Sequence, residues 1–160
     1  MGDRSSDPHD GTDGTASDAR RLLTDGGSTD GLVTIESDAS VTDSVERVKA
    51  VIEEKEALGL MAEIDHEANG ATVGRDLPPT TVLVFGNPDL GTPLMQAGRS
   101  LAIDLPQKLL VMEDDDGTVT VTYNDPAYLA DRHDIEGEAD RLETVSDALS
   151  SLAAVAAGTE

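Results

Sequence analysis

The segment from residue 85 to residue 95 places two glycines and a helix start directly after an apolar run. Gly86 and Gly91 carry no side chain, so another molecule could approach the backbone closely. Thr92 is a residue type that caps helices, and Pro93 is favoured at a first helical position. The free amides of such a helix start would suit a carboxylate or another anion. The segment is either a ligand-binding loop or a turn that only joins a strand to a helix.

His66 is the second group that could carry out chemistry, because an imidazole can ligate a metal or haem and can transfer protons near neutral pH. Asp65 or Glu67 could orient its ring. The alternative is a histidine that only forms a hydrogen bond at a strand end. His133 follows Arg132 at an expected helix end, where the helix dipole favours a positive ring. A metal site would require His66 and His133 to converge.

Tyr123 could present its phenol to the same cleft, whereas Asn124 and Asp125 fit a turn and a helix cap. The acidic run at residues 114–117 lacks the alternating ligands and closing Glu of an EF-hand, so we interpret it as a solvated hairpin turn. The side chains that we expect to contact a ligand are His66, Phe85, Gly86, Asn87, Pro88, Gly91, Thr92 and Tyr123. His66 is the candidate metal ligand, and the sequence specifies no cofactor.

Apolar periodicity predicts the elements that position these residues. Alternating runs predict strands at residues 31–36, 60–65, 80–85, 108–112 and 118–123. Three- and four-residue spacing predicts a helix that starts near Val41 and ends at Gly59, and shorter helices at 93–103 and 126–132. A final amphipathic helix is expected at 136–157. This order indicates an α+β fold with two layers, in which helices pack on one face of a mixed or largely antiparallel sheet.

The domain organisation follows from composition. Residues 1–30 are rich in Asp, Gly, Ser and Thr, which predicts a disordered acidic tail. Residues 31–157 form a single predicted domain. The connection at residues 66–79 has no clear periodicity, and a connection of that length is often functional.

The chain carries 33 acidic and 11 basic residues, for a formal net charge of −22. Such a charge excludes nucleic acid and anionic membranes as expected partners, because both require basic surfaces. Low Lys, high Asp and few aromatic residues are typical of proteins from salt-accumulating halophilic archaea. Cys is absent, which rules out thiol chemistry, and neither a membrane span nor a signal peptide is evident. We therefore expect a cytoplasmic protein.

Several motifs together resemble the family known as domain of unknown function 302. They are Ile64-Asp65-His66, Gly74, Phe85-Gly-Asn-Pro88, Gly91-Thr-Pro-Leu-Met95, Asp104-Leu-Pro106 and Tyr123-Asn-Asp-Pro126. The resemblance covers residues 31 to 133. It implies a compact α+β domain that often forms homodimers, and it implies no biochemical role.

Three functions are compatible with these observations. The first is a small cytoplasmic domain that binds a small ligand, haem or a metal between the Gly86–Thr92 loop and His66. The second is a small enzyme in which His66 is the acid–base residue and Asn87 and Thr92 orient the substrate. The third is a non-catalytic regulatory homodimer formed through the apolar stripe of the final helix, from Leu142 to Ala156.

Overall fold

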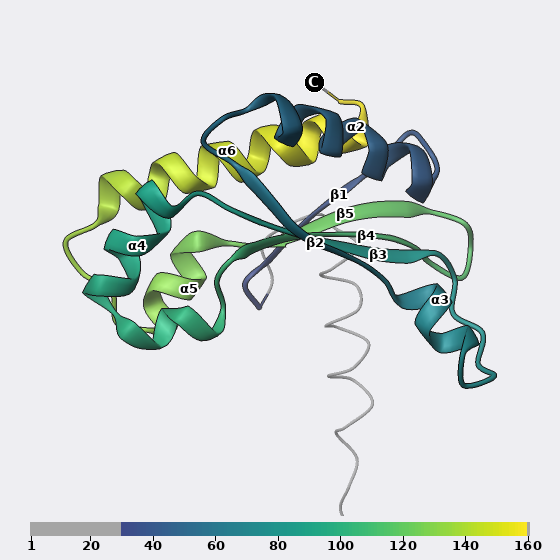
Figure 1. The fold of residues 1–160 in the computed structure, drawn as a ribbon, viewed down its shortest axis with the longest axis horizontal. Helices are drawn as coiled ribbons and strands as arrows, with labels where there is room; N and C mark the ends of the chain where they lie inside the picture. The colour runs from purple at the N-terminus through teal and green to yellow at the C-terminus, as the bar shows by residue number, and fades with distance from the viewer. Residues whose placement is uncertain (1–29, 160) are drawn as a thin grey trace, which may run out of the picture.

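The computed structural model describes residues 30–159, and it contains one five-stranded antiparallel sheet in the order β1-β5-β4-β3-β2. Figure 1 shows the two longest helices together on one side of this sheet. The predicted two-layer α+β fold is therefore confirmed, with every strand pairing antiparallel. Apart from Asp30, the predicted acidic tail lies outside the described residues. The strands are β1 (Leu32–Glu36), β2 (Gly59–Asp65), β3 (Thr80–Gly86), β4 (Gln107–Glu113) and β5 (Val119–Asn124).

Two long helices cover the sheet. They are α2 (Val41–Glu54) and α6 (Ala139–Ala157). The Ser40 side chain caps α2 by accepting a hydrogen bond from the Asp43 amide at 3.0 Å, as its residue type favours. The apolar stripe of α2 is buried, and Val48 and Ile52 are almost completely shielded from solvent. The helix ends at Glu54, and Gly59 begins β2 instead of ending α2 as the sequence suggested.

The core lies between the sheet and these two helices. Alternate side chains of the central strands, such as Leu83 and Val111, are fully buried against the helices, as the two-residue repeat of a strand requires. The apolar stripe of α6 joins the same core, because Leu149 and Leu152 are buried within a single chain. The proposal that this stripe forms a dimer interface is therefore wrong, since its side chains already pack internally.

The shorter helices lie beyond the strand ends, at two opposite ends of the sheet (Figure 1). They are α3 (His66–Ala71), α4 (Pro88–Ala97), the 3-10 helix η1 (Arg99–Ile103) and α5 (Pro126–Arg132). Asp125 caps α5 by accepting from the Ala127 amide at 3.0 Å, as predicted. The connection at 66–79 was expected to be irregular, but its first part is α3. The Asp65 carboxylate caps this helix by accepting from the Ala68 amide at 2.9 Å.

Helix α4 begins five residues earlier than the sequence suggested. Asn87 is its cap and Pro88 its first residue, so Pro93 lies inside the helix and not at its start. Pro88 fits the first helical turn because the amide of that position has no partner in a helix anyway. Because the helix starts directly after β3, its first two turns lie against the end of the sheet.

Candidate functional site

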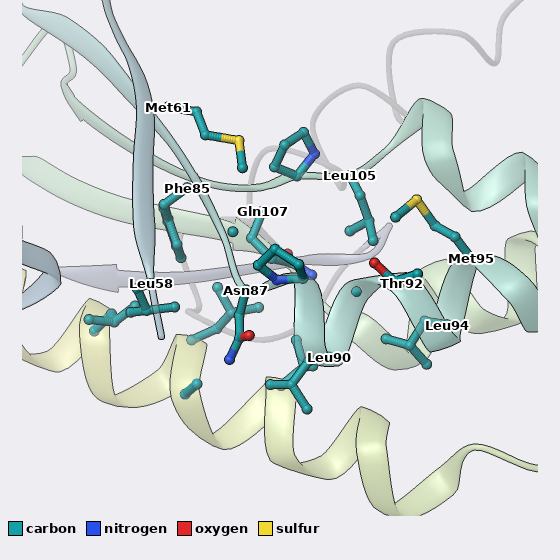
Figure 2. A pocket seen from close by; sticks show the side chains of 18 residues that line it. Leu58, Met61, Phe85, Asn87, Leu90, Thr92, Leu94, Met95, Leu105 and Gln107 are labelled. Carbon is teal, nitrogen blue, oxygen red and sulfur yellow. The ribbon is translucent and has the colours of Figure 1, made fainter. Parts of the chain in front are cut away.

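A cavity of about 250 Å³ lies where the end of β3, the start of β4 and helix α4 meet α6. Figure 2 shows its side chains arranged around one space. The strand β3 contributes Phe85 and Gly86, and α4 contributes its first two turns. The α6 helix closes the opposite side with Val145, Ala148, Leu149 and Leu152. The remaining lining residues are Leu58, Met61, Asn87, Pro88, Leu90, Gly91, Thr92, Leu94, Met95, Leu105, Pro106 and Gln107.

Six of the eight predicted contact residues line this cavity together. They are Phe85, Gly86, Asn87, Pro88, Gly91 and Thr92. The two glycines contribute open space and not an unusual backbone angle, since neither has a positive φ. A β-carbon built on Gly91 would lie 3.5 Å from Leu105 Cδ1, and one on Gly86 would lie 3.2 Å from Met61 Cε. Side chains at these positions would therefore narrow the cavity.

The cavity wall contains no ionisable side chain. This is unusual for a chain in which 28% of the residues are charged. Apolar walls with a few polar groups are the common lining of sites that bind small molecules. The polar groups here are the side-chain amides of Asn87 and Gln107 and the hydroxyl of Thr92.

Only the oxygen of the Asn87 side-chain amide forms a hydrogen bond within the described fold. Its Oδ1 accepts a hydrogen bond from the Asp89 amide at 3.0 Å, which caps α4. The Nδ2 group donates to no described residue, and the Gln107 and Thr92 side chains also lack a hydrogen-bond partner within residues 30–159. These polar atoms are not fully buried, because no fully buried side-chain nitrogen or oxygen among the described residues lacks a hydrogen-bond partner. They are therefore available to a bound molecule.

The backbone amides at the start of α4 are not available to an anion. Besides the Asp89 amide, those of Leu90 and Gly91 donate to the Asn87 carbonyl at 3.0 and 2.9 Å. Pro88 has no amide hydrogen at all. The expected anion site is therefore wrong, because the helix starts at Asn87 and satisfies its first-turn donors locally.

His66 lies away from the cavity. It begins α3 and is exposed, and the neighbouring Asp65 pairs with Thr81 near the start of β3. The cavity lies beyond Gly86, at the other end of the same strand, roughly 17–20 Å away at about 3.3 Å per residue. His66 instead borders a wider concavity of about 980 Å³ on the sheet face opposite α2 and α6, together with the acidic hairpin at residues 114–116. A shared site for His66 and the Gly86–Thr92 loop is therefore excluded.

Tyr123 also lies outside the cavity. Its side chain is 8% exposed, and it shares the helix-facing side of the sheet with Val121. Burial raises the pKa of the Tyr123 hydroxyl, and a hydrogen bond with Ser150 opposes part of this shift. The phenol is thus a core group held under α6 and away from this cavity, while Tyr123 also borders the concavity beside His66.

The structure reveals a polar cluster that the sequence did not predict. His133 Nδ1 lies 2.7 Å from Ser100 Oγ, and His133 Nε2 lies 2.6 Å from Asp104 Oδ2. Arg132 donates to the same carboxylate at 3.0 Å. The His133 side chain is only 6% exposed. The only sequence signal was that Asp104 and His133 fall in or near motifs of the resembling family.

This cluster has the bonding order of a serine nucleophile, a histidine base and an orienting carboxylate. However, Ser100 borders neither the cavity between α4 and α6 nor the concavity beside His66. The cluster joins η1 to the end of α5, and we assign it a structural role. Because both ring nitrogens of His133 are bonded at the η1 end of the sheet, His133 does not converge with His66.

The described residues contain no group of three or more His, Asp or Glu side chains placed to hold a metal ion. No helix within residues 30–159 combines the length and apolar character that a membrane crossing requires.

Sequence comparison finds relatives that are longer than this chain. The chain is 45% identical over 105 residues to "Fluoride-specific ion channel FluC 1" of Brucella suis biovar 1 (strain 1330), which is 66% of this chain and 41% of that protein. It is equally identical to the protein of the same name from Brucella abortus biovar 1 (strain 9-941), with 38% of that protein covered. The chain thus spans about two fifths of these relatives. None of these comparisons supports the expected haloarchaeal origin.

Structural comparison identifies a solved structure with the same fold. An uncharacterized conserved protein DUF302 from Bacillus stearothermophilus superposes with a TM-score of 0.69, although the sequences are only 16% identical. The superposition covers 79% of this chain and 98% of the other, which shows a common fold. The family model "Domain of unknown function DUF302" matches residues 33–153. The chain therefore belongs to the DUF302 family, as its motifs suggested.

Proposed function

We propose that this chain is a small-molecule-binding domain and that its ligand occupies the cavity between α4 and α6. The observation that carries the proposal is a cavity of about 250 Å³ without an ionisable lining residue in a chain of net charge −22. Core packing normally leaves few voids larger than a water molecule. An apolar pocket of this size, with the free NH₂ groups of Asn87 and Gln107 on its wall, has the lining that is common in sites for small molecules.

The size and lining of the cavity favour a small organic ligand over haem. Drug-sized ligands occupy cavities of roughly 300–1,000 Å³, so 250 Å³ suits a smaller molecule. Haem iron is usually held by His, Cys, Met or Tyr. Only Met61 and Met95 among the lining residues belong to this set, and two thioethers are more commonly adaptable core groups. An enzyme in which His66 is the acid–base residue and Asn87 orients the substrate is disfavoured, because these two residues do not share a site.

A blocked cavity tests the proposal. Ala148 is exposed on α6 and lines the cavity, so Ala148→Phe should fill its mouth. Ser151→Phe places the same side chain at an exposed position of the same helix that does not line the cavity. Native mass spectrometry and thermal shift with acetophenone should show binding to the parent chain and the Ser151 variant but not to the Ala148 variant. Equal binding by all three proteins would contradict the assignment of the site.

A second proposed role is that of a ligand-responsive domain associated with a membrane protein. It is favoured by the relatives named as fluoride channels, in which the region similar to this chain is about two fifths of the protein. The cavity itself does not favour fluoride, because an uncharged apolar wall offers no compensation for burying an anion. Titration with fluoride, followed by NMR of the amides around Gln107, should show no saturable shift. Saturable binding would indicate that the domain captures fluoride directly.

We also propose a cytoplasmic homodimer that is stabilised by high salt, although no surface is assigned to the dimer. Native mass spectrometry of protein purified in molar potassium chloride measures the oligomeric state. A monomer at micromolar concentration would refute the dimer.

A further inference from the structure

We infer that the ligand is a neutral, mostly apolar molecule with one carbonyl or hydroxyl oxygen, and that the side-chain amides of Asn87 and Gln107 recognise this oxygen. The inference rests on the proposed function, since it specifies the chemistry of the molecule in the cavity between α4 and α6.

The uncharged wall of the cavity disfavours an anionic ligand. A carboxylate or phosphate taken into this cavity would lose its hydration without gaining a cation, because no Lys, Arg or His lines the wall. The cation next in sequence to Gln107 is Lys108, but its Nζ already donates to the carbonyls of Asp104 and Pro106 at 2.8 and 2.9 Å. Lys108 also faces the concavity on the other side of the sheet. The overall negative field of the chain opposes an anion further.

A cationic ligand is disfavoured for a related reason. An ammonium group needs carboxylates or several carbonyl oxygens to replace its water. No Asp or Glu side chain lines the cavity, although the chain contains 33 of them. The absence of acidic groups at this place in so acidic a chain points to a neutral ligand.

The Asn87 side chain offers a hydrogen-bond donor to the ligand. The Asp89 amide can only donate, so the Asn87 atom 3.0 Å away must be the carbonyl oxygen of its side chain. This bond fixes the orientation of the amide and leaves its NH₂ group as the free part. Gln107 adds a second amide without a partner among the described residues. A ligand oxygen that accepts from these NH₂ groups satisfies them, whereas a pure hydrocarbon leaves them without a partner.

The volume of the cavity limits the size of the ligand. A cavity of about 150 Å³ in another protein accommodates benzene. By that scale, a cavity of about 250 Å³ holds roughly eight to ten non-hydrogen atoms. Acetophenone, ethylbenzene and benzoate all have this size, and they differ in the feature that the inference addresses. Acetophenone is neutral with an acceptor, ethylbenzene lacks the acceptor, and benzoate carries a charge.

The experiment measures the Kd of these three probes for the full chain in molar potassium chloride, by calorimetry or NMR titration. One net hydrogen bond corresponds to about fivefold in affinity, so acetophenone should bind about fivefold more tightly than ethylbenzene. Benzoate should bind at least tenfold more weakly than acetophenone. Gln107→Met keeps the length of the side chain but removes the amide, and it should reduce the preference for acetophenone over ethylbenzene. Gln96→Met, at an exposed α4 position outside the cavity lining, should leave the preference unchanged.

The possible results distinguish a failure of the proposed function from a failure of the inferred ligand chemistry. If none of the three probes binds, the proposed function fails. If ethylbenzene and acetophenone bind equally well, or benzoate binds as tightly as acetophenone, the cavity binds ligands but the inferred head group is wrong. If Gln107→Met folds with an unchanged melting temperature and an unchanged preference, recognition by the Gln107 amide is refuted.

Discussion

Replacement of Gly91 by alanine tests whether the cavity is maintained at the expense of stability. Gly91 lies in the second turn of α4 and has no positive φ, so alanine fits its backbone. The added β-carbon would have one near neighbour, Leu105 Cδ1, at the ordinary contact distance of 3.5 Å. No steric clash therefore opposes the substitution.

The expected effects on stability and on binding have opposite signs. Glycine within a helix is roughly 0.5–1 kcal/mol less favourable than alanine, so Gly91→Ala should raise the free energy of unfolding by about that amount. For a domain of this size the melting temperature should rise by roughly 2–6 °C. A methyl group is about as large as a water molecule, roughly 30 Å³, so it should remove on the order of a tenth of the cavity. Acetophenone should therefore bind more weakly to the more stable protein.

The assay combines thermal unfolding without ligand and titration with acetophenone. Gly70→Ala is the matched control, because Gly70 lies in α3, away from the cavity, and its β-carbon would be 3.4 Å from the nearest atom, the Arg75 carbonyl oxygen. It should stabilise the chain without a change in affinity. A lower melting temperature for Gly91→Ala would contradict the expected gain in helix stability, whereas a higher one with unchanged affinity would refute the assignment of Gly91 to the cavity wall.

Three further predictions concern other parts of the chain. His133→Ala should destabilise the protein by about 1–3 kcal/mol in chemical denaturation, because the Asp104 carboxylate loses a partner in a partly buried place; Arg132→Gln should cost less, since Arg132 is 55% exposed. Because the pKa of Tyr123 is raised in the folded chain, the unfolded chain releases this phenolic proton first as pH rises. The stability of the fold should therefore fall above pH 10, and the fall should be smaller in Tyr123→Phe. Melting curves between pH 8 and 11 measure both proteins. The melting temperature should rise steeply as potassium chloride increases from about 0.1 to 1 M, because the Debye length falls from about 10 to 3 Å and screens the carboxylates from one another. A melting temperature that stays constant over this range would disprove strong repulsion among the carboxylates.

The sequence predicts most of the fold because its elements are local patterns. The strand at 80–85 and the buried stripe of α2 each follow from the spacing of a few apolar residues. The sequence predicts the start of α4 too far along the chain, and the reason is physical. Two Pro residues, Pro88 and Pro93, both fit a first helical position, and only the hydrogen bond from the Asp89 amide to Asn87 identifies the true start.

The cavity was only half predictable. Its residues from β3 and α4 are consecutive, so a sequence pattern can show them together. The wall formed by α6 is different, because Val145 and Leu149 lie about 60 residues from the loop and have the spacing of ordinary core positions. His66 lies far from the loop because β2 and β3 run antiparallel, which brings the end of β2 beside the start of β3 and not beside its end. The Ser100–His133–Asp104 cluster depends likewise on contacts across about 30 residues.

The segment after β3 was open to two interpretations, a turn or a binding loop, and the geometry of Asn87 makes them compatible. An Asn at a helix cap commits its side-chain oxygen to a backbone amide, as Asn87 does with Asp89. The same bond leaves the NH₂ group as the only free polar part of that side chain. An aspartate would cap the helix equally well but would bring a negative charge to an otherwise uncharged wall. Thus Asn87→Asp should preserve α4 but abolish the preference for a ligand oxygen. Measurement of both helix content and probe affinity in this variant separates the structural role of Asn87 from its role in binding.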